Sequence, residues 1–265
     1  MADRESARKE AARKAYEMLQ SRPRPAFNAP KLKAFFAPSH EGVRQGGENL
    51  IRLMSSLAGI NPYIQEWRVV RDAHDHEAGR GLNPLEDPRA FVDYCVATSK
   101  EDFYQLEVLA FSKEIFPDDP RTYSAGISFS GGSSQSRSNA LTFYCTGSHR
   151  DRNLSFNQWA EMIFQIIAWR EPRMVSVGTG NYATYDRVFW DRAWDGWMAW
   201  LPKKIDPRIL PESAITIPME PGTLVAAQQE NVDGTDPVQK RNANELELSL
   251  VEGGLLPTVE ELTGI

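Results

Sequence analysis

The segment between Ser155 and Pro172 places the strongest constraint on how this chain can fold. Ser155-Phe-Asn-Gln158 has the spacing of a capping box, in which a serine and a glutamine satisfy each other's backbone N–H groups at a helix start. Glu171-Pro172 ends the helix, because proline cannot continue it. We therefore predict a heavily buried helix over residues 156–169, whose apolar residues form a wide face: Phe156, Trp159, Ala160, Ile163, Phe164, Ile166 and Ile167.

Strand-like segments lie on both sides of this helix. A second helix is predicted over 47–59, and Leu246, Leu248 and Leu250 alternate with polar residues, which predicts a strand. Strands grouped with helices on either side favour a single α+β domain, with a mixed or antiparallel sheet packed by the helices near 47–59 and 156–169. The other predicted strands, rich in aromatic and aliphatic residues, are 103–111, 124–129, 140–145, 174–177, 184–189, 196–201, 214–217 and 223–227.

The first 40 residues differ from the rest of the chain. Residues 3–20 are rich in Ala, Arg, Lys and Glu and predict an extra N-terminal helix, and three prolines follow within ten residues. We therefore expect 1–40 to form a helix with a Pro-rich connection, and 41–265 to form the α+β domain. The charged start lacks the apolar region of a secretory signal, and no run is long enough for a membrane span. A cytoplasmic protein is expected.

The net charge of −6 is concentrated near the C-terminus, since residues 205–265 carry three Lys/Arg and eleven Asp/Glu. An acidic chain is not expected to bind nucleic acid directly. The acidic residues either form a solvated surface or face a basic protein partner. In the second case the predicted contact residues are Asp233, Asp236, Glu245, Glu247 and Glu252. Glu245 and Glu247 alternate with the leucines at 246, 248 and 250, so they would point outward from the predicted strand.

One cluster of metal-type ligands occurs, formed by Asp72, His74, Asp75 and His76. On a strand, a His-x-His pair would place both rings on one face, as zinc sites do, whereas in a polar loop the same residues are solvated. The chain has neither a Gly-x-Ser-x-Gly elbow nor a phosphate-binding glycine loop. We expect no enzyme, metal or cofactor, and keep a metal-dependent hydrolase using His74 and His76 as the alternative.

The two cysteines, Cys95 and Cys145, are expected to be reduced. Cys145 shares one predicted strand face with Leu141 and Phe143, which favours a buried thiol. A disulfide or a nucleophile is the alternative.

The most aromatic segment reads FWDRAWDGWMAW and ends at Trp200, with four of the seven tryptophans in eleven positions. Two interpretations apply to it. The tryptophans pack in the core, or one or two of them, such as Trp194, stand on the surface as anchors for a partner, since Trp is enriched in interface hot spots.

The same segment resembles the immunity protein 52 family of bacterial polymorphic toxin systems. The matching pattern is Asp191-x-x-Trp194-x-Gly196-Trp197-Met198-x-x-Leu201-Pro202, followed by Gly222-Thr223 and by Asn242 to Pro257 with its Leu-Leu-Pro ending. Looser matches are Leu50 to Ile60 leading to Trp67, and the Phe129-Ser-Gly-Gly turn. The resemblance covers most of the chain from about residue 40, and the residues it marks as structural are Asp191, Gly196, Trp197, Leu201, Pro202 and Pro257.

The resemblance implies an α+β immunity protein and no catalysis. Family members bind and neutralise a cognate toxin, typically a nuclease delivered by a secretion system such as type VI. We therefore expect a stoichiometric inhibitor, with a monomer favoured and no membrane or nucleic-acid contact. An effector chaperone or secretion adaptor is the further alternative.

Overall fold

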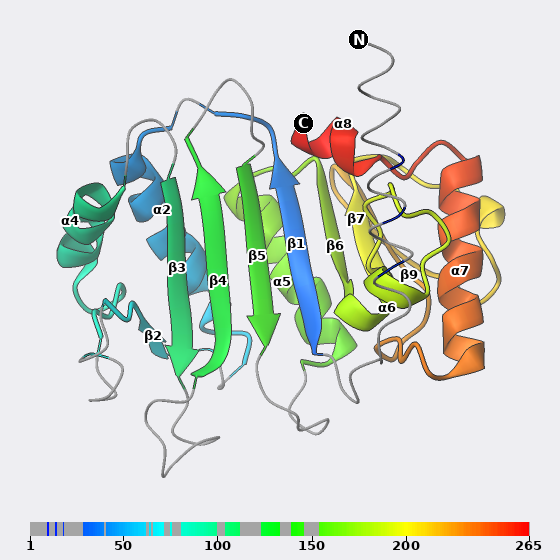
Figure 1. Cartoon of the computed structure of the whole chain (residues 1–265), viewed down its shortest axis with the longest axis horizontal. Coiled ribbons are helices and arrows are strands. Elements are labelled where there is room, and N and C mark those ends of the chain that lie inside the picture. The colour runs from blue at the N-terminus through cyan, green and yellow to red at the C-terminus, as the bar shows by residue number, and fades with distance from the viewer. Residues whose placement is uncertain are drawn as a thin grey trace.

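The computed structural model describes residues 10, 14, 18, 29–39, 41–61, 64, 66–71, 75, 81–99, 104–111, 123–132, 139–145 and 154–264. These residues form a single α+β domain, as predicted, with an open nine-stranded sheet and six α-helices (Figure 1). All strand pairs are antiparallel, in the order β2-β3-β4-β5-β1-β6-β7-β9-β8. The elements are β1 (Pro30–Phe36), α2 (Val43–Leu57), β2 (Glu66–Arg68), α4 (Pro88–Thr98), β3 (Tyr104–Phe111), β4 (Tyr123–Gly131), β5 (Asn139–Cys145), α5 (Phe156–Trp169), β6 (Met174–Thr179), α6 (Gly180–Tyr185), β7 (Gly196–Leu201), the 3₁₀ helix η3 (Pro207–Ile209), β8 (Ile215–Met219), β9 (Gly222–Ala226), α7 (Pro237–Glu252) and α8 (Val259–Thr263).

Local patterns identified seven of these strands, namely β3 to β9. The predicted strand over 184–189 is wrong, because residues 180–185 form α6. Thr179 ends β6 and caps this helix, since its hydroxyl oxygen accepts a hydrogen bond from Tyr182 N at 3.2 Å. The cap outweighs the strand preference of the aromatic residues that follow it. No described helix combines the length and the apolar character needed to cross a membrane.

The central strand is one that sequence reasoning did not predict. Residues 30–36, assigned above to a Pro-rich connection, form β1, which pairs with β5 on one side and β6 on the other. Pro30 is tolerated because it is the first residue of the strand. Leu32, Ala34 and Phe36 are buried, whereas Lys31 and Lys33 point to the opposite face. Of the predicted helix over 3–20, only positions 10, 14 and 18 lie among the described residues.

Two long helices cover one face of the sheet and lie behind it in Figure 1. The predicted helix over 156–169 is α5, and its capping box is formed, with Gln158 N donating to Ser155 Oγ at 3.3 Å and Ser155 N to Gln158 Oε1 at 2.9 Å. The predicted helix over 47–59 is α2, which begins four residues earlier. Trp159 of α5 packs edge-on against Phe143 of β5, with 5.6 Å between ring centroids.

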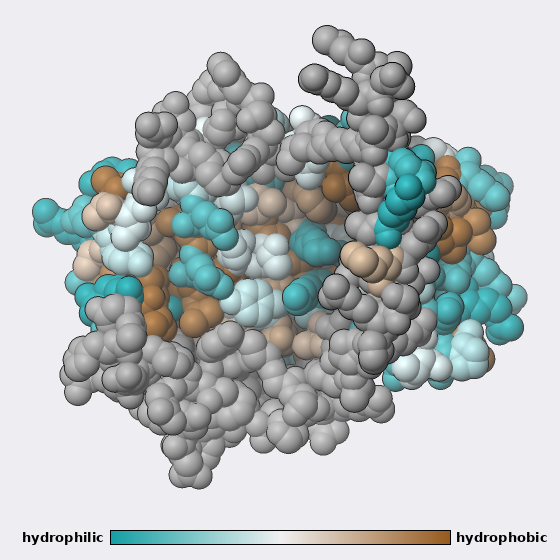
Figure 2. All heavy atoms as spheres, in the orientation of Figure 1, coloured by the Kyte–Doolittle hydropathy of each residue, from teal (hydrophilic) through white to brown (hydrophobic). Residues whose placement is uncertain are grey.

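The opposite face carries no helix over β3, β4, β5 and β1 among the described residues. One row of paired residues crosses it, from Glu107 through Ser128, Thr142 and Lys33 to Ser176. Figure 2 shows mostly pale and teal atoms at the centre of this face. An antiparallel sheet commonly presents one such polar face to water.

The segment with Leu246, Leu248 and Leu250 belongs to helix α7, so the prediction of a strand there is wrong. Asp236 caps α7, since its carboxylate accepts hydrogen bonds from Val238 N at 2.8 Å and Gln239 N at 3.2 Å. The alternating leucines fit a strand, but Leu246 and Leu250 are also one helical turn apart and so share one face of a helix. Both are fully buried, whereas Leu248 is 38% exposed.

This helix turns Glu247 inward, so the prediction that Glu247 contacts a partner is wrong. The side chain is fully buried, and its carboxylate accepts hydrogen bonds from Val188 N at 2.8 Å and Phe189 N at 2.9 Å. The Tyr182 hydroxyl donates a third at 3.1 Å. Burial raises the pKa of Glu247, and the two backbone hydrogen bonds oppose that shift. Glu247 therefore holds α7 to the segment that follows α6.

Three of the four tryptophans in the aromatic segment, Trp194, Trp197 and Trp200, lie in the core, and Trp190 is half-buried. Trp197 is 1% exposed, its indole N–H donates to Gln228 O at 3.1 Å, and its ring lies edge-on to Phe156 at 6.3 Å. The preceding Gly196 has a φ of +102°, and a Cβ there would lie 2.2 Å from the Tyr182 ring. Only glycine fits this position, which lets the Tyr182 ring of α6 lie directly against the backbone at the start of β7.

We predict that Trp197→Ala lowers the free energy of unfolding by about 3–5 kcal/mol, the usual cost of emptying a large buried aromatic site. The matched control is Phe164→Ala on α5, since Phe164 is 48% exposed, and its effect should stay within about 0.5 kcal/mol. Urea unfolding followed by circular dichroism measures both. Equal effects of the two substitutions would contradict the burial of Trp197.

Glu247→Gln is expected to lower the free energy of unfolding by about 1–3 kcal/mol, because the amide group turns a donor toward a buried backbone N–H. Glu245→Gln, on the exposed side of the same helix, is the control and should change stability by less than about 0.5 kcal/mol. A neutral Glu247→Gln in the same unfolding assay would show that the three hydrogen bonds are dispensable.

A dependence on pH follows from the raised pKa of Glu247. Between its ordinary pKa of 4.5 and the higher folded value, the folded protein holds a proton that the unfolded chain has released. This contribution to stability is complete below the ordinary pKa and is lost as pH rises through the folded pKa. The stability difference between the natural protein and Glu247→Gln should therefore favour the natural protein more at about pH 4.5 than at about pH 8. A constant difference would contradict the shift.

Candidate functional site

The acidic residues predicted to contact a partner have different environments. Glu245 and Glu252 are exposed on α7 and, being seven residues apart, lie on one side of the helix. Asp236 is the α7 cap described above. Asp233 accepts hydrogen bonds at one carboxylate oxygen from the backbone N–H of Thr235 at 3.0 Å and from its hydroxyl at 2.7 Å. Glu245 and Glu252 therefore remain as the exposed candidates.

Trp194 is fully buried, so its prediction as a surface anchor is wrong. The segment around it is tied to the far end of the chain, because Val259 N donates to Asp191 O at 2.8 Å and Ala193 N donates to Pro257 O at 3.1 Å. The two stretches that carry the family resemblance thus meet in space. Aromatic content signalled this segment in the sequence, but it could not separate core from surface.

Three other marked positions lie around β7. Gly196 and Leu201 are the ends of the strand and are buried, and Pro202 follows it and is exposed. A Cβ on Gly222 would lie 2.0 Å from the Leu201 carbonyl oxygen, so glycine lets the two strands approach closely.

His74 and His76 lie outside the described residues, as does Asp72. Asp75 is buried and paired with Arg71, whose Nε lies 2.6 Å from its carboxylate. Within the described ranges, no three His, Cys, Asp or Glu side chains are grouped so that they could hold a metal ion.

The cysteines are both free thiols. Burial raises the pKa of Cys95 to about 12 and the pKa of Cys145 to about 12. Since the thiolate is the nucleophile, neither side chain is activated at neutral pH.

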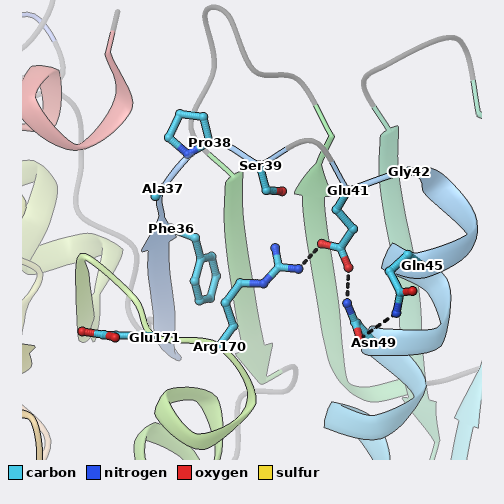
Figure 3. Close-up of a pocket in the computed structure, with 10 residues that line it drawn as sticks. All are labelled: Phe36, Ala37, Pro38, Ser39, Glu41, Gly42, Gln45, Asn49, Arg170 and Glu171. Atoms are coloured by element: carbon cyan, nitrogen blue, oxygen red, sulfur yellow. Dashed lines mark hydrogen bonds and ion pairs between the residues drawn. The ribbon is translucent and has the colours of Figure 1, made fainter.

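A pocket of about 610 Å³ opens where β1 ends and α2 begins (Figure 3). Its walls come from three places in the chain: the end of β1 and the turn after it, the first two turns of α2, and the residues after α5. The volume is in the range of small-molecule sites. The lining residues are Phe36, Ala37, Pro38, Ser39, Glu41, Gly42, Gln45, Asn49, Arg170 and Glu171.

Arg170 is the central charged residue of this pocket. Its guanidinium carbon lies 5.8 Å from the Phe36 ring centre, 5.6 Å from Phe129 and 5.1 Å from Trp169, which favours a fixed cation by cation–π attraction. One terminal nitrogen forms an ion pair with Glu41, drawn as a dashed line in Figure 3. The other, Nη1, is buried without a hydrogen-bond partner among the described residues.

Glu41 lies between Arg170 and α2. Its second carboxylate oxygen accepts a hydrogen bond from the Asn49 side-chain amide. The backbone carbonyl oxygen of Asn49 accepts a hydrogen bond from the Trp169 indole N–H at 2.8 Å, which ties the end of α5 to α2. Sequence reasoning missed this site because its residues come from separate elements and form no motif. The only local signal is an arginine at the end of a helix.

Neither a protein-family profile nor a curated protein sequence matches the chain. Among solved structures, the fold is similar to that of the Pseudomonas aeruginosa type VI secretion system (T6SS) protein PA0821, with a TM-score of 0.50 and 12% sequence identity. The similarity covers 87% of this chain and 76% of that chain. The resemblance to the immunity protein 52 family therefore has no counterpart among family profiles, and what this chain shares with PA0821 is a fold.

Proposed function

We propose that this protein is an immunity protein that binds and neutralises a cognate nuclease toxin delivered by a type VI secretion system. The observation that carries the proposal is the fold shared with a T6SS protein over 87% of the chain. The sequence pattern around Trp197 and Pro257 supports it, because that pattern resembles an immunity family. We propose action in the cytoplasm, where such a nuclease meets DNA.

Charge supports a basic partner. A nuclease carries positive potential where it holds phosphates, and an acidic inhibitor complements that surface and gains association rate by steering. Glu245 and Glu252 are proposed as the contact residues on this protein. They share the exposed side of α7 with Leu248, which is 38% exposed, and with Val238, which is 52% exposed. Apolar positions within an acidic surface suit a protein partner better than a purely solvated face.

Neutralisation by binding should be stoichiometric. Titrating the protein against the proposed cognate nuclease should abolish DNA cleavage near an equimolar ratio, because each inhibitor molecule occupies one toxin molecule. Continued loss of cleavage at strongly substoichiometric amounts would indicate catalysis. That outcome would favour the hydrolase alternative, for which the metal content of the purified protein is the second measurement.

The double substitution Glu245→Lys with Glu252→Lys should slow association with the toxin more than it changes dissociation, because exposed charges act chiefly on encounter. The association rate should also depend less on salt between about 50 and 300 mM than it does for the natural protein. The control is Glu86→Lys with Glu161→Lys, two exposed glutamates away from α7, which changes the net charge equally. Stopped-flow association measures both.

Equal slowing by the two double substitutions would place the contact elsewhere than α7. A secretion adaptor is separated by location, since an immunity protein stays in the producing cell whereas an adaptor associates with the effector before export. Cell fractionation after induced secretion, with protection scored in the same strains, decides between the two.

A further inference from the structure

We propose that α7 is an interface between two copies of this chain, whose α7 helices pack side by side in opposite directions. The proposal does not depend on toxin binding. It rests on a line of exposed residues along α7 that complements itself when a second copy is turned by a two-fold rotation. The residues of this line, the outer stripe of α7, are Val238, Arg241, Glu245, Leu248 and Glu252.

The outer stripe lies on the side of α7 that faces away from the rest of the molecule. Its residues follow one another at intervals of three, four, three and four, which is the spacing of a seam between two packed helices. Since each residue turns the helix by about 100°, the stripe lies opposite the buried residues Ala243, Leu246, Glu247 and Leu250. In Figure 1, α7 stands at the right-hand side of the molecule, beyond β7 and β9. A second helix can therefore approach the stripe from outside.

Two large apolar side chains of the outer stripe are exposed. Val238 is 52% exposed and Leu248 is 38% exposed. Single exposed apolar residues are common on protein surfaces, but these two share one stripe and lie near its two ends. When two α7 helices pack in opposite directions, Val238 can lie opposite the partner's Leu248. The two-fold rotation then repeats this contact, so both apolar residues of each copy are covered.

The charges between these apolar residues complement each other in the same register. Arg241 lies three residues after Val238, and Glu245 lies three residues before Leu248. Arg241 therefore lies opposite the partner's Glu245 whenever Val238 lies opposite the partner's Leu248. Within one chain, Arg241 Nε and the Glu245 carboxylate are 3.9 Å apart, and 66% and 49% of the two side chains are exposed. An exposed pair of this kind contributes little to stability, so both charges are available to a partner.

The same charges favour the antiparallel direction over the parallel one. In a parallel pair of helices, each seam residue meets its own copy. Arg241 would then lie beside the partner's Arg241, and Glu245 beside the partner's Glu245, where like charges repel. In the antiparallel pair each of these charges meets one of opposite sign. Glu252 lies beyond the last matched pair, toward the start of the partner's α7, where the positive end of the helix favours a carboxylate.

The length of the seam sets the strength of the dimer. From Val238 to Leu248 the helix rises by about 15 Å, which makes a contact smaller than a standard protein interface. A weak dimer that forms as the protein concentration rises is therefore expected.

A dimer of this kind departs from the monomer favoured from the sequence, and it would control access to α7. The toxin contact proposed above uses Glu245 and Glu252, which belong to the same stripe. A second copy and the toxin would therefore exclude each other. Self-association is measured on this protein alone, so its failure leaves the proposed toxin binding intact.

The first test is sedimentation of the full chain without toxin over a series of protein concentrations. The natural protein should shift from monomer toward dimer as concentration rises. Arg241→Glu and Glu245→Arg each place like charges opposite one another, so each should weaken the dimer at least tenfold. The two substitutions change the net charge in opposite directions, so a weakening shared by both reports the seam. The double variant should restore the dimer, because every charge pair forms again with its signs exchanged. Phe164→Ser on α5 is the control, since Phe164 is 48% exposed, and should leave the dimer unchanged.

The second test examines the register by disulfide cross-linking. Val238→Cys mixed with Leu248→Cys should form disulfides between the two variants on mild oxidation, because the two positions face each other across the seam. Val238→Cys alone should form few, because position 238 lies about 15 Å along the helix from its own copy, too far for a disulfide.

Three results would overturn the proposal. The natural protein could remain a monomer at every concentration. The double variant could self-associate as weakly as the two single variants. Val238→Cys alone could cross-link as well as the mixture does, which would indicate a different register or direction.

Discussion

The hydrogen bonding of β1 to both of its neighbours is the interaction on which the rest of this structure depends. β5 belongs to a run of four strands, β2-β3-β4-β5, and β6 begins another, β6-β7-β9-β8. β1 joins the two runs into one sheet by pairing with β5 over Lys31–Phe36 and with β6 over Pro30–Phe35. Since its partners lie more than 100 residues away in the chain, the two runs join into one sheet only when distant segments have come together.

The position of the Arg170 pocket follows from the central place of β1 in the sheet. β1 ends at Phe36 and α2 follows it, while α5 ends at Trp169 and Arg170 follows it before β6. The connection that leaves β1 and the connection that enters β6 therefore meet at one end of the sheet. Their charged residues, Glu41 and Arg170, pair there.

Polar contacts to buried carboxylates organise the part of the molecule around β6 and α7. Glu247 of α7 binds backbone N–H groups from the segment after α6, and Asp195 accepts hydrogen bonds from Ser176 Oγ at 2.6 Å and Lys33 Nζ at 2.9 Å. Removing one partner from such a group leaves a buried polar atom unsatisfied. On α7, Glu245 and Glu252 are exposed, with the Glu245 carboxylate 3.9 Å from Arg241 Nε, so these two remain in the proposed interface and the buried Glu247 does not.

The sequence by itself determined the α+β class, the capping box and extent of α5, and seven of the nine strands, because these depend on contacts between near neighbours in the chain. Tertiary structure decided the rest. Leu246 and Leu250 fit both a strand and a helix, and burial on one face of α7 selected the helix. β1, the inward turn of Glu247 and the pocket at Arg170 depend on partners more than 50 residues away, and local periodicity carries no information about such pairings.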